Sequence, residues 1–121
     1  MADTVPKKVT RTLYRGDSRT WVHVFTDGDG NPIDLTGYEF IAQFRPDLDR
    51  GTVICSSACT VGGDDNNEVT EVLSADQAEL LPGQTGSTKP KVYWDLQSTK
   101  DGDVTTWMYA SVPVVGDVSD A

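Results

Sequence analysis

The chain has little of what most catalytic and metal sites require. Its 121 residues include one histidine, His23, and two cysteines, Cys55 and Cys59. A closed zinc site needs about four such ligands, which are not available here. A regular strand through this small, β-branched segment would hold the two cysteine backbones roughly 13 Å apart, too far for a disulfide unless the chain turns between them. We expect two reduced strand cysteines, with no metal and no cofactor.

Long apolar runs and basic residues are also scarce. No stretch approaches the ~18 uninterrupted apolar residues of a membrane-spanning helix, and residues 1–8 lack the apolar core of a secretory signal. Ten Lys and Arg against nineteen Asp and Glu give a net charge of −9, which repels a phosphate backbone. The sequence predicts one domain made in the cytoplasm, bound to neither membrane nor nucleic acid.

What the chain does have is turn-forming residues at regular intervals of about eight to twelve residues, a spacing typical of all-β sandwiches and barrels. Residues 19–26 carry apolar groups on both faces, which predicts a central strand. Residues 38–44 read as a half-buried strand, and 91–97 with 105–110 as a hairpin across 100–103. Pro113 favours a sheet edge or a strand break.

One short helix is predicted after Leu73. Ser74 to Gln77 fits a capping box, in which Ser74 accepts a hydrogen bond from the Gln77 amide and the Gln77 side chain reaches back. Pro82 and Gly83 would end the helical segment. The predicted core consists of the larger apolar residues of these elements: Trp21, Phe25, Leu35, Phe40, Phe44, Leu80, Leu81, Tyr93, Leu96 and Met108.

Two candidate sites are better read as structure. His23 lies mid-strand between valines, which favours a packed histidine over a catalytic base. The segment from Asp27 begins like a calcium loop, but Pro32 stands at position 6, where an EF-hand needs Gly, and Tyr38 at position 12, where it needs Glu. We therefore expect a turn at residues 27–37, no catalytic residues, and a protein that is not an enzyme.

Charge is distributed unevenly. Residues 1–25 hold five basic residues against Asp3 and Asp17, a net +3, whereas the remainder carries −12. This basic start could bind the acidic surface of a neighbouring copy, or simply protect a sheet edge. The predicted interface combines basic residues, an excursion at 84–90 and two tryptophans: Lys7, Lys8, Arg11, Arg15, Arg19, Gln84, Thr85, Lys89, Trp94 and Trp107.

The order of several motifs over residues 13–119 resembles the immunoglobulin-like β-sandwich modules of tailed-phage virions, typified by baseplate upper proteins and long-tail-fibre collar proteins. The motifs are residues 15–18 before an apolar strand, 29–38, the helical turn 73–83, 93–97 and 112–119. The segment 84–90 departs from such modules, which pass quickly from the Pro-Gly to the next strand.

This resemblance implies an all-β, immunoglobulin-like antiparallel sandwich of about seven to eight strands with one short helix. Residues 1–12 would form a basic arm or edge strand and 13–121 the domain. The implied function is a non-enzymatic virion subunit of the tail, collar or baseplate. It would be made in the bacterial host and would assemble with copies of itself and other virion proteins. The alternatives are a capsid decoration protein and a carbohydrate- or host-surface-binding module, for which Trp107 or Tyr109 would have to be exposed.

Overall fold

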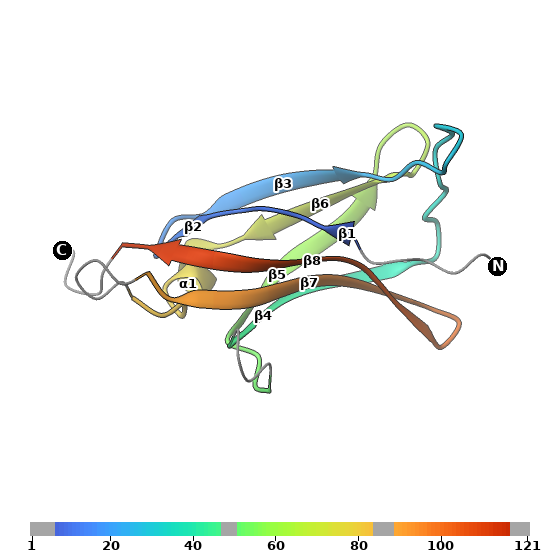
Figure 1. Cartoon of the computed structure of the whole chain (residues 1–121). Helices are drawn as coiled ribbons and strands as arrows, with labels where there is room; N and C mark the ends of the chain where they lie inside the picture. Colours follow the sequence, from blue (N-terminus) through green and yellow to red (C-terminus); the bar gives the residue numbers. More distant parts are fainter. Residues whose placement is uncertain (1–6, 47–50, 84–88, 117–121) are drawn as a thin grey trace.

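We describe the fold from a computed structural model, in which residues 7–46, 51–83 and 89–116 are placed. The described residues form eight strands and one short helix (Figure 1). In chain order these are β1 (Lys7–Lys8), β2 (Leu13–Tyr14), β3 (Arg19–Val24), β4 (Glu39–Pro46), β5 (Cys55–Gly62), β6 (Glu68–Leu73), α1 (Ala75–Ala78), β7 (Lys91–Lys100) and β8 (Asp103–Val115).

The strands follow one hydrogen-bonded path, β1-β8-β7-β4-β5-β6-β3, with β2 also paired to β8. Strand β5 joins the two halves of this path, because its first residues pair with β4 and its later ones with β6. The sheet curls so that β6 faces β7, and Trp94 Nε1 of β7 donates to Glu71 of β6 at 3.0 Å. The predicted all-β class with one short helix is confirmed, although the halves are one curled sheet and β1 and β2 run parallel to β8.

The predicted hairpin is formed by β7 and β8, which pair along their whole length. Its two-residue turn places Asp101 and Gly102 at φ of 52° and 86°, the left-handed conformation that suits the twist of a tight hairpin. A register shift occurs after Leu96, so that Trp107 is an extra residue between the partners of β7. A bulge of this kind re-aims side chains, and it lets both Trp107 and Met108 pack against the core.

Strand β3 was predicted to be central, but it lies at the end of the sheet order. Its outward side chains Val22 and Val24 are 56% and 58% exposed. Apolar residues on both faces therefore do not mark a central strand here, because side chains point above and below a sheet and do not report whether the hydrogen-bonding edge is occupied.

Pro113 was also misread, since β8 continues through it in the interior of the sheet. The Val114 amide donates to the Pro90 carbonyl oxygen at 2.8 Å. The backbone nitrogen of the preceding residue, Pro113, therefore faces away from β7 and towards the N-terminal segment, so its lack of an N–H costs no bond to β7. That segment pairs with β8 at 7–8 and 13–14 but forms no strand between them. The proline is tolerated because it lies at this interruption.

The core lies between the facing halves of the sheet and agrees largely with prediction. Phe25, Leu35, Phe44, Leu81 and Leu96 are buried. A second predicted group packs against the core while partly exposed: Trp21, Phe40 and Met108. Two predictions were wrong: Leu80 is 55% exposed and Tyr93 is half-buried.

Helix α1 begins as predicted, with Ser74 Oγ accepting the Gln77 amide at 3.2 Å. The reciprocal half of the capping box is absent among the described residues. Gln77 Oε1 instead accepts the Ser56 amide of β5 at 2.9 Å. The glutamine therefore ties the helix to the sheet rather than closing its own first turn.

Candidate functional site: a buried ion cluster under the N-terminal arm

A fully buried glutamate on β6, Glu71, is the centre of the most concentrated polar chemistry in the described part of the chain. Its two carboxylate oxygens accept from Arg11 Nη1 and Nη2 at 3.1 and 3.2 Å. They also lie 2.8 Å from His23 Nε2 and 3.0 Å from Trp94 Nε1. Charged groups are rarely buried unless paired, and here one carboxylate is shared by a guanidinium, an imidazole and an indole.

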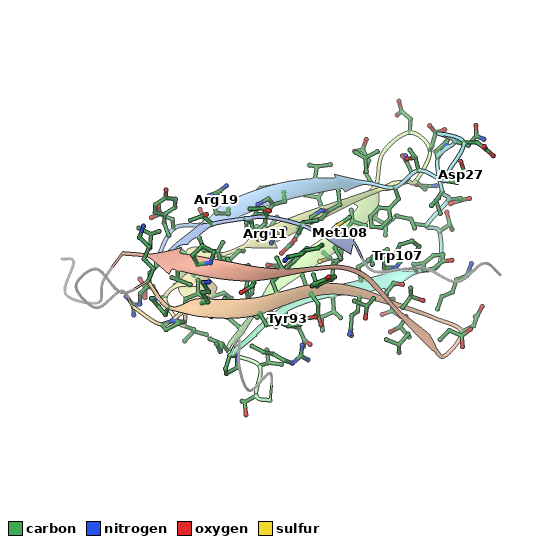
Figure 2. The ribbon with its side chains drawn as sticks, viewed as in Figure 1. Arg11, Arg19, Asp27, Tyr93, Trp107 and Met108 are labelled. Atoms are coloured by element: carbon green, nitrogen blue, oxygen red, sulfur yellow. The ribbon has the colours of Figure 1, made fainter. Side chains whose placement is uncertain are left out.

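Arg11 reaches this carboxylate from the N-terminal arm, defined here as residues 7–14, which lies between β3 and β8 (Figures 1 and 2). Its guanidinium lies 3.8 Å from the ring centroid of Trp21 and 3.7 Å from that of Trp94. A guanidinium between two aromatic faces keeps favourable electrostatic contacts after leaving water. Side-chain burial alternates along the arm: Arg11 and Leu13 are buried, and Thr10 and Thr12 are exposed.

The electrostatics of the cluster favour the ionised carboxylate. Burial alone would raise the pKa of Glu71, but the hydrogen bond from His23 and the charge of Arg11 outweigh it and leave the pKa below its usual value. Burial lowers the pKa of Arg11, and the attraction of Glu71 opposes that shift. The interactions therefore outweigh the cost of burying the carboxylate but only partly oppose the cost of burying the guanidinium.

The prediction that His23 is a packed residue is confirmed. Its ring stacks on Trp94 with centroids 5.9 Å apart, and its side chain is 10% exposed. With Nε2 engaged by Glu71, the imidazole has no free path to an incoming substrate at that nitrogen. The cluster ties the arm, through Arg11, to β6, β3 and β7.

The structure separates the predicted interface residues. Arg11 and Trp94 are buried within the chain, so their prediction as contacts for neighbours is corrected. Trp107 is half-buried, donates to Ser98 Oγ at 2.7 Å and packs edge-on against Phe25.

The remaining interface predictions fall near the surface or outside the described residues. Arg15 binds the carbonyls of Leu81 and Glu79 at 3.1 and 2.9 Å, which fixes the chain after β2. Arg19 is half-buried beside Trp21, and Lys8 and Lys89 are exposed. Of Lys7 only the backbone, in β1, is described, and Gln84 and Thr85 lie outside the described residues.

The loop after β3 is a turn, as expected. The carboxylate Oδ1 of Asp27 accepts the amides of Asp29 and Asn31 at 2.9 and 3.0 Å. Such side-chain-to-backbone bonds replace the pairing that an isolated turn lacks. The carboxylate that would open a calcium loop is therefore engaged with its own backbone.

Both cysteines are free thiols, as expected, and both lie in β5. Burial raises the pKa of Cys55 to about 11. Burial and the nearby Glu71 charge raise the pKa of Cys59 to about 12. Thiols with such values are almost wholly protonated at neutral pH and are poor nucleophiles.

An apolar hollow of about 700 Å³ lies at the opposite end of β7 from its hairpin. Its lining includes Pro46, Ile54, Leu80, Pro82 and Val92. The exposure of Leu80 is explained by its place at this hollow, where it faces outward instead of into the core.

The comparisons with known proteins add no family: no family model and no curated protein matches this chain. Within the described residues, no helix is long and apolar enough to cross a membrane. Sequence reasoning found His23 but missed Glu71 and Arg11 as a pair. The available signal was a glutamate inside an otherwise apolar strand pattern, Val69-Thr70-Glu71-Val72-Leu73, where it occupies an inward position.

Proposed function

We propose that this protein is a non-enzymatic structural subunit of a bacteriophage virion, an adaptor associated with the tail, collar or baseplate. It would assemble with copies of itself and with other virion proteins. The single observation that carries the proposal is the strand order. The runs β3-β6-β5 and β4-β7-β8 match the orders B-E-D and C-F-G of an immunoglobulin-type module, although β4 also pairs with β5 and joins the two runs into one sheet.

Three of the motifs on which the resemblance rests lie in the connections between these strands. Residues 15–18 turn the chain from β2 into β3, with Gly16 at φ 86°. Residues 29–38 connect β3 to β4, and residues 73–83 hold α1 between β6 and β7. The other two motifs lie mainly in strands, since 93–97 is part of β7 and 112–115 ends β8, whereas 117–119 lies outside the described residues.

Two competing functions have less support. A carbohydrate-binding module needs an exposed aromatic face. Trp107 packs among Phe25, Tyr38 and Phe40, and Tyr109 is half-buried and stacked on Tyr93 with ring centroids 6.4 Å apart. A histidine-dependent enzyme needs an accessible base, whereas His23 is engaged with Glu71. Both observations favour a protein whose polar residues stabilise its own fold.

The test is the location and copy number of the protein in purified particles. An affinity-tagged protein would be gold-labelled for microscopy and quantified against the major capsid protein. We expect a small number of copies, as in a single ring, at the neck or tail. Hundreds of copies over the head would indicate a capsid decoration protein instead, and absence from particles would refute the virion proposal.

A further inference from the structure

The edge of β3 carries a row of free backbone groups. Just beyond the end of β3, the Phe25 amide donates to the Asn67 carbonyl oxygen, just before β6, at 2.8 Å. Two residues back along β3, His23 stands opposite Val69 in the same register. In an antiparallel pair, alternate residues point their N–H and C=O towards the partner. The odd residues of β3 therefore bond β6, and Thr20, Val22 and Val24 point theirs away. No described residue bonds these groups, because the arm pairs with β8.

The same three residues also present exposed side chains. Val22 and Val24 are 56% and 58% exposed, and neighbouring Val72 of β6 is 41% exposed. Besides Gly62, the register places eight described residues on this outer face of β3, β6 and β5: Thr20, Val22, Val24, Ala58, Thr60, Glu68, Thr70 and Val72. Glu68 is the one charged residue among them, on a chain whose net charge is −9. Two copies of an acidic protein repel each other least where their surfaces lack carboxylates.

Edge strands in isolated proteins are normally guarded by lysine, proline or a bulge. The other end of this sheet follows that rule, since β1 is two residues long and both are lysines. Strand β3 is six residues long and pairs with β6 without a register shift. Its charged residue, Arg19, is half-buried at the first position, and Thr20 to Val24 include neither lysine nor proline. Its unguarded edge is the one best suited to adding a strand.

We propose that β3 is a self-association surface, which pairs antiparallel with β3 of a second copy about a twofold axis at Val22. Thr20 would then stand opposite Val24 of the second copy, and Val22 opposite its counterpart. Both members of each pair project free backbone groups to the edge and side chains to the same face, so the pairing requires no change of register. Each pair can exchange two hydrogen bonds, about six in all. This inference deepens the self-assembly in the proposed function and depends on that function for its biological meaning.

The size of such a contact sets its strength. Two strands of six residues joined by their edges bury less than the ~1,200 Å² of a specific stable complex. We therefore expect reversible association, measurable between about 10 µM and 1 mM protein, that becomes strong when many copies are held together.

The test uses the full chain in sedimentation velocity and in amide exchange followed by NMR. Wild-type protein should dimerise with concentration, and Val22→Lys, which places two ammonium groups at the twofold axis, should weaken dimerisation at least about tenfold. Val104→Lys is the matched control, because Val104 is 64% exposed on β8, away from this edge. Amides of Thr20, Val22 and Val24 should gain protection at high concentration, whereas that of His23, bonded to β6, should be protected throughout.

Three results would overturn the proposal. The first is a protein that stays monomeric up to about 1 mM. The second is a dimer that Val22→Lys leaves unchanged or that Val104→Lys weakens equally. The third is a dimer that Val72→Lys weakens as much as Val22→Lys, because Val72 shares the face but not the edge, and face-to-face stacking would then be responsible. None of these results bears on where the protein resides in particles, so the two proposals fail separately.

Discussion

Replacing Glu71 by glutamine tests whether the buried ion cluster holds the N-terminal arm in place. The substitution preserves the shape of the side chain and removes its charge. Arg11 would remain between the rings of Trp21 and Trp94 without a counter-charge. The indole of Trp94 would keep an oxygen acceptor, so the loss falls mainly on the two charged or titratable partners, Arg11 and His23.

The expected magnitude follows from the burial of the pair. Glu71 is fully buried and the side chain of Arg11 is 6% exposed. Removing one partner from such a pair costs about 3–5 kcal/mol, because the remaining charge is left desolvated. A domain has about 5–15 kcal/mol of stability in total, so we expect Glu71→Gln to lose a large fraction of its free energy of unfolding.

The assay is urea unfolding followed by tryptophan fluorescence, for wild type, Glu71→Gln, Arg11→Met and the double variant. The loss of unfolding free energy in the double variant should be about 2 kcal/mol smaller than the sum of the two single losses. The reason is that each single change leaves the other buried group without its partner. Additive costs, or a loss below about 1 kcal/mol for Glu71→Gln, would refute the reasoning.

The same cluster predicts the pH dependence. Because folding lowers the pKa of Glu71, its contribution is present above the unfolded value of 4.5 and is lost as the pH falls through the lower folded-state value. The difference in stability between wild type and Glu71→Gln should therefore shrink as the pH falls below the unfolded value of 4.5. A difference that stays constant from pH 7 to the acid limit would contradict this assignment.

The remaining predictions concern single residues. Cys55 and Cys59, with pKa values raised to about 11 and 12, should be alkylated at pH 8 far more slowly in native protein than in urea, as followed by mass spectrometry; equal rates would contradict their burial. Gly102→Ala should cost about 1–2 kcal/mol in urea unfolding because of its positive φ, and no loss would argue against the turn. Ser74→Ala should cost about 1 kcal/mol through its cap on Gln77, and a loss within error would show that the cap contributes little.

Much of the fold was predictable because local chemistry determines it. The turn at Gly102, the cap at Ser74 and the alternation of Phe40, Ala42 and Phe44 each depend on nearby residues. The position of β3 at the edge was not predictable in this way. Edge position depends on which strands of the whole sheet pair, and side-chain alternation is the same in central and edge strands.

The candidate site was harder to predict for a related reason. Arg11 and Glu71 are 60 positions apart in the chain. The inward position of Glu71 in an apolar strand pattern indicates a buried carboxylate, but it does not indicate which cation pairs with it. Arg11 was predicted to lie on a basic, exposed strand because residues 1–25 carry a net charge of +3. Only the curl of the sheet, which brings β6 under the arm, turns it into the partner of a buried carboxylate.

A charged anchor specifies the register of the arm in a way that an apolar one would not. The paired segments of the arm are two residues each, and inward positions recur every second residue. If residue 11 were apolar, a slip of two residues would bring another apolar side chain to the same place at little cost. With Arg11, the slip would leave both Glu71 and a guanidinium unpaired.

We therefore expect Arg11→Leu to loosen the register as well as the stability. The bond from the Val9 amide to the Tyr109 carbonyl, 2.9 Å in the native arm, should lose protection in hydrogen exchange, and the arm should show more than one set of amide resonances. Arg11→Lys retains a positive charge near Glu71 and should keep one set. A single native register in Arg11→Leu would mean that β8 alone aligns the arm and that the ion pair contributes stability only.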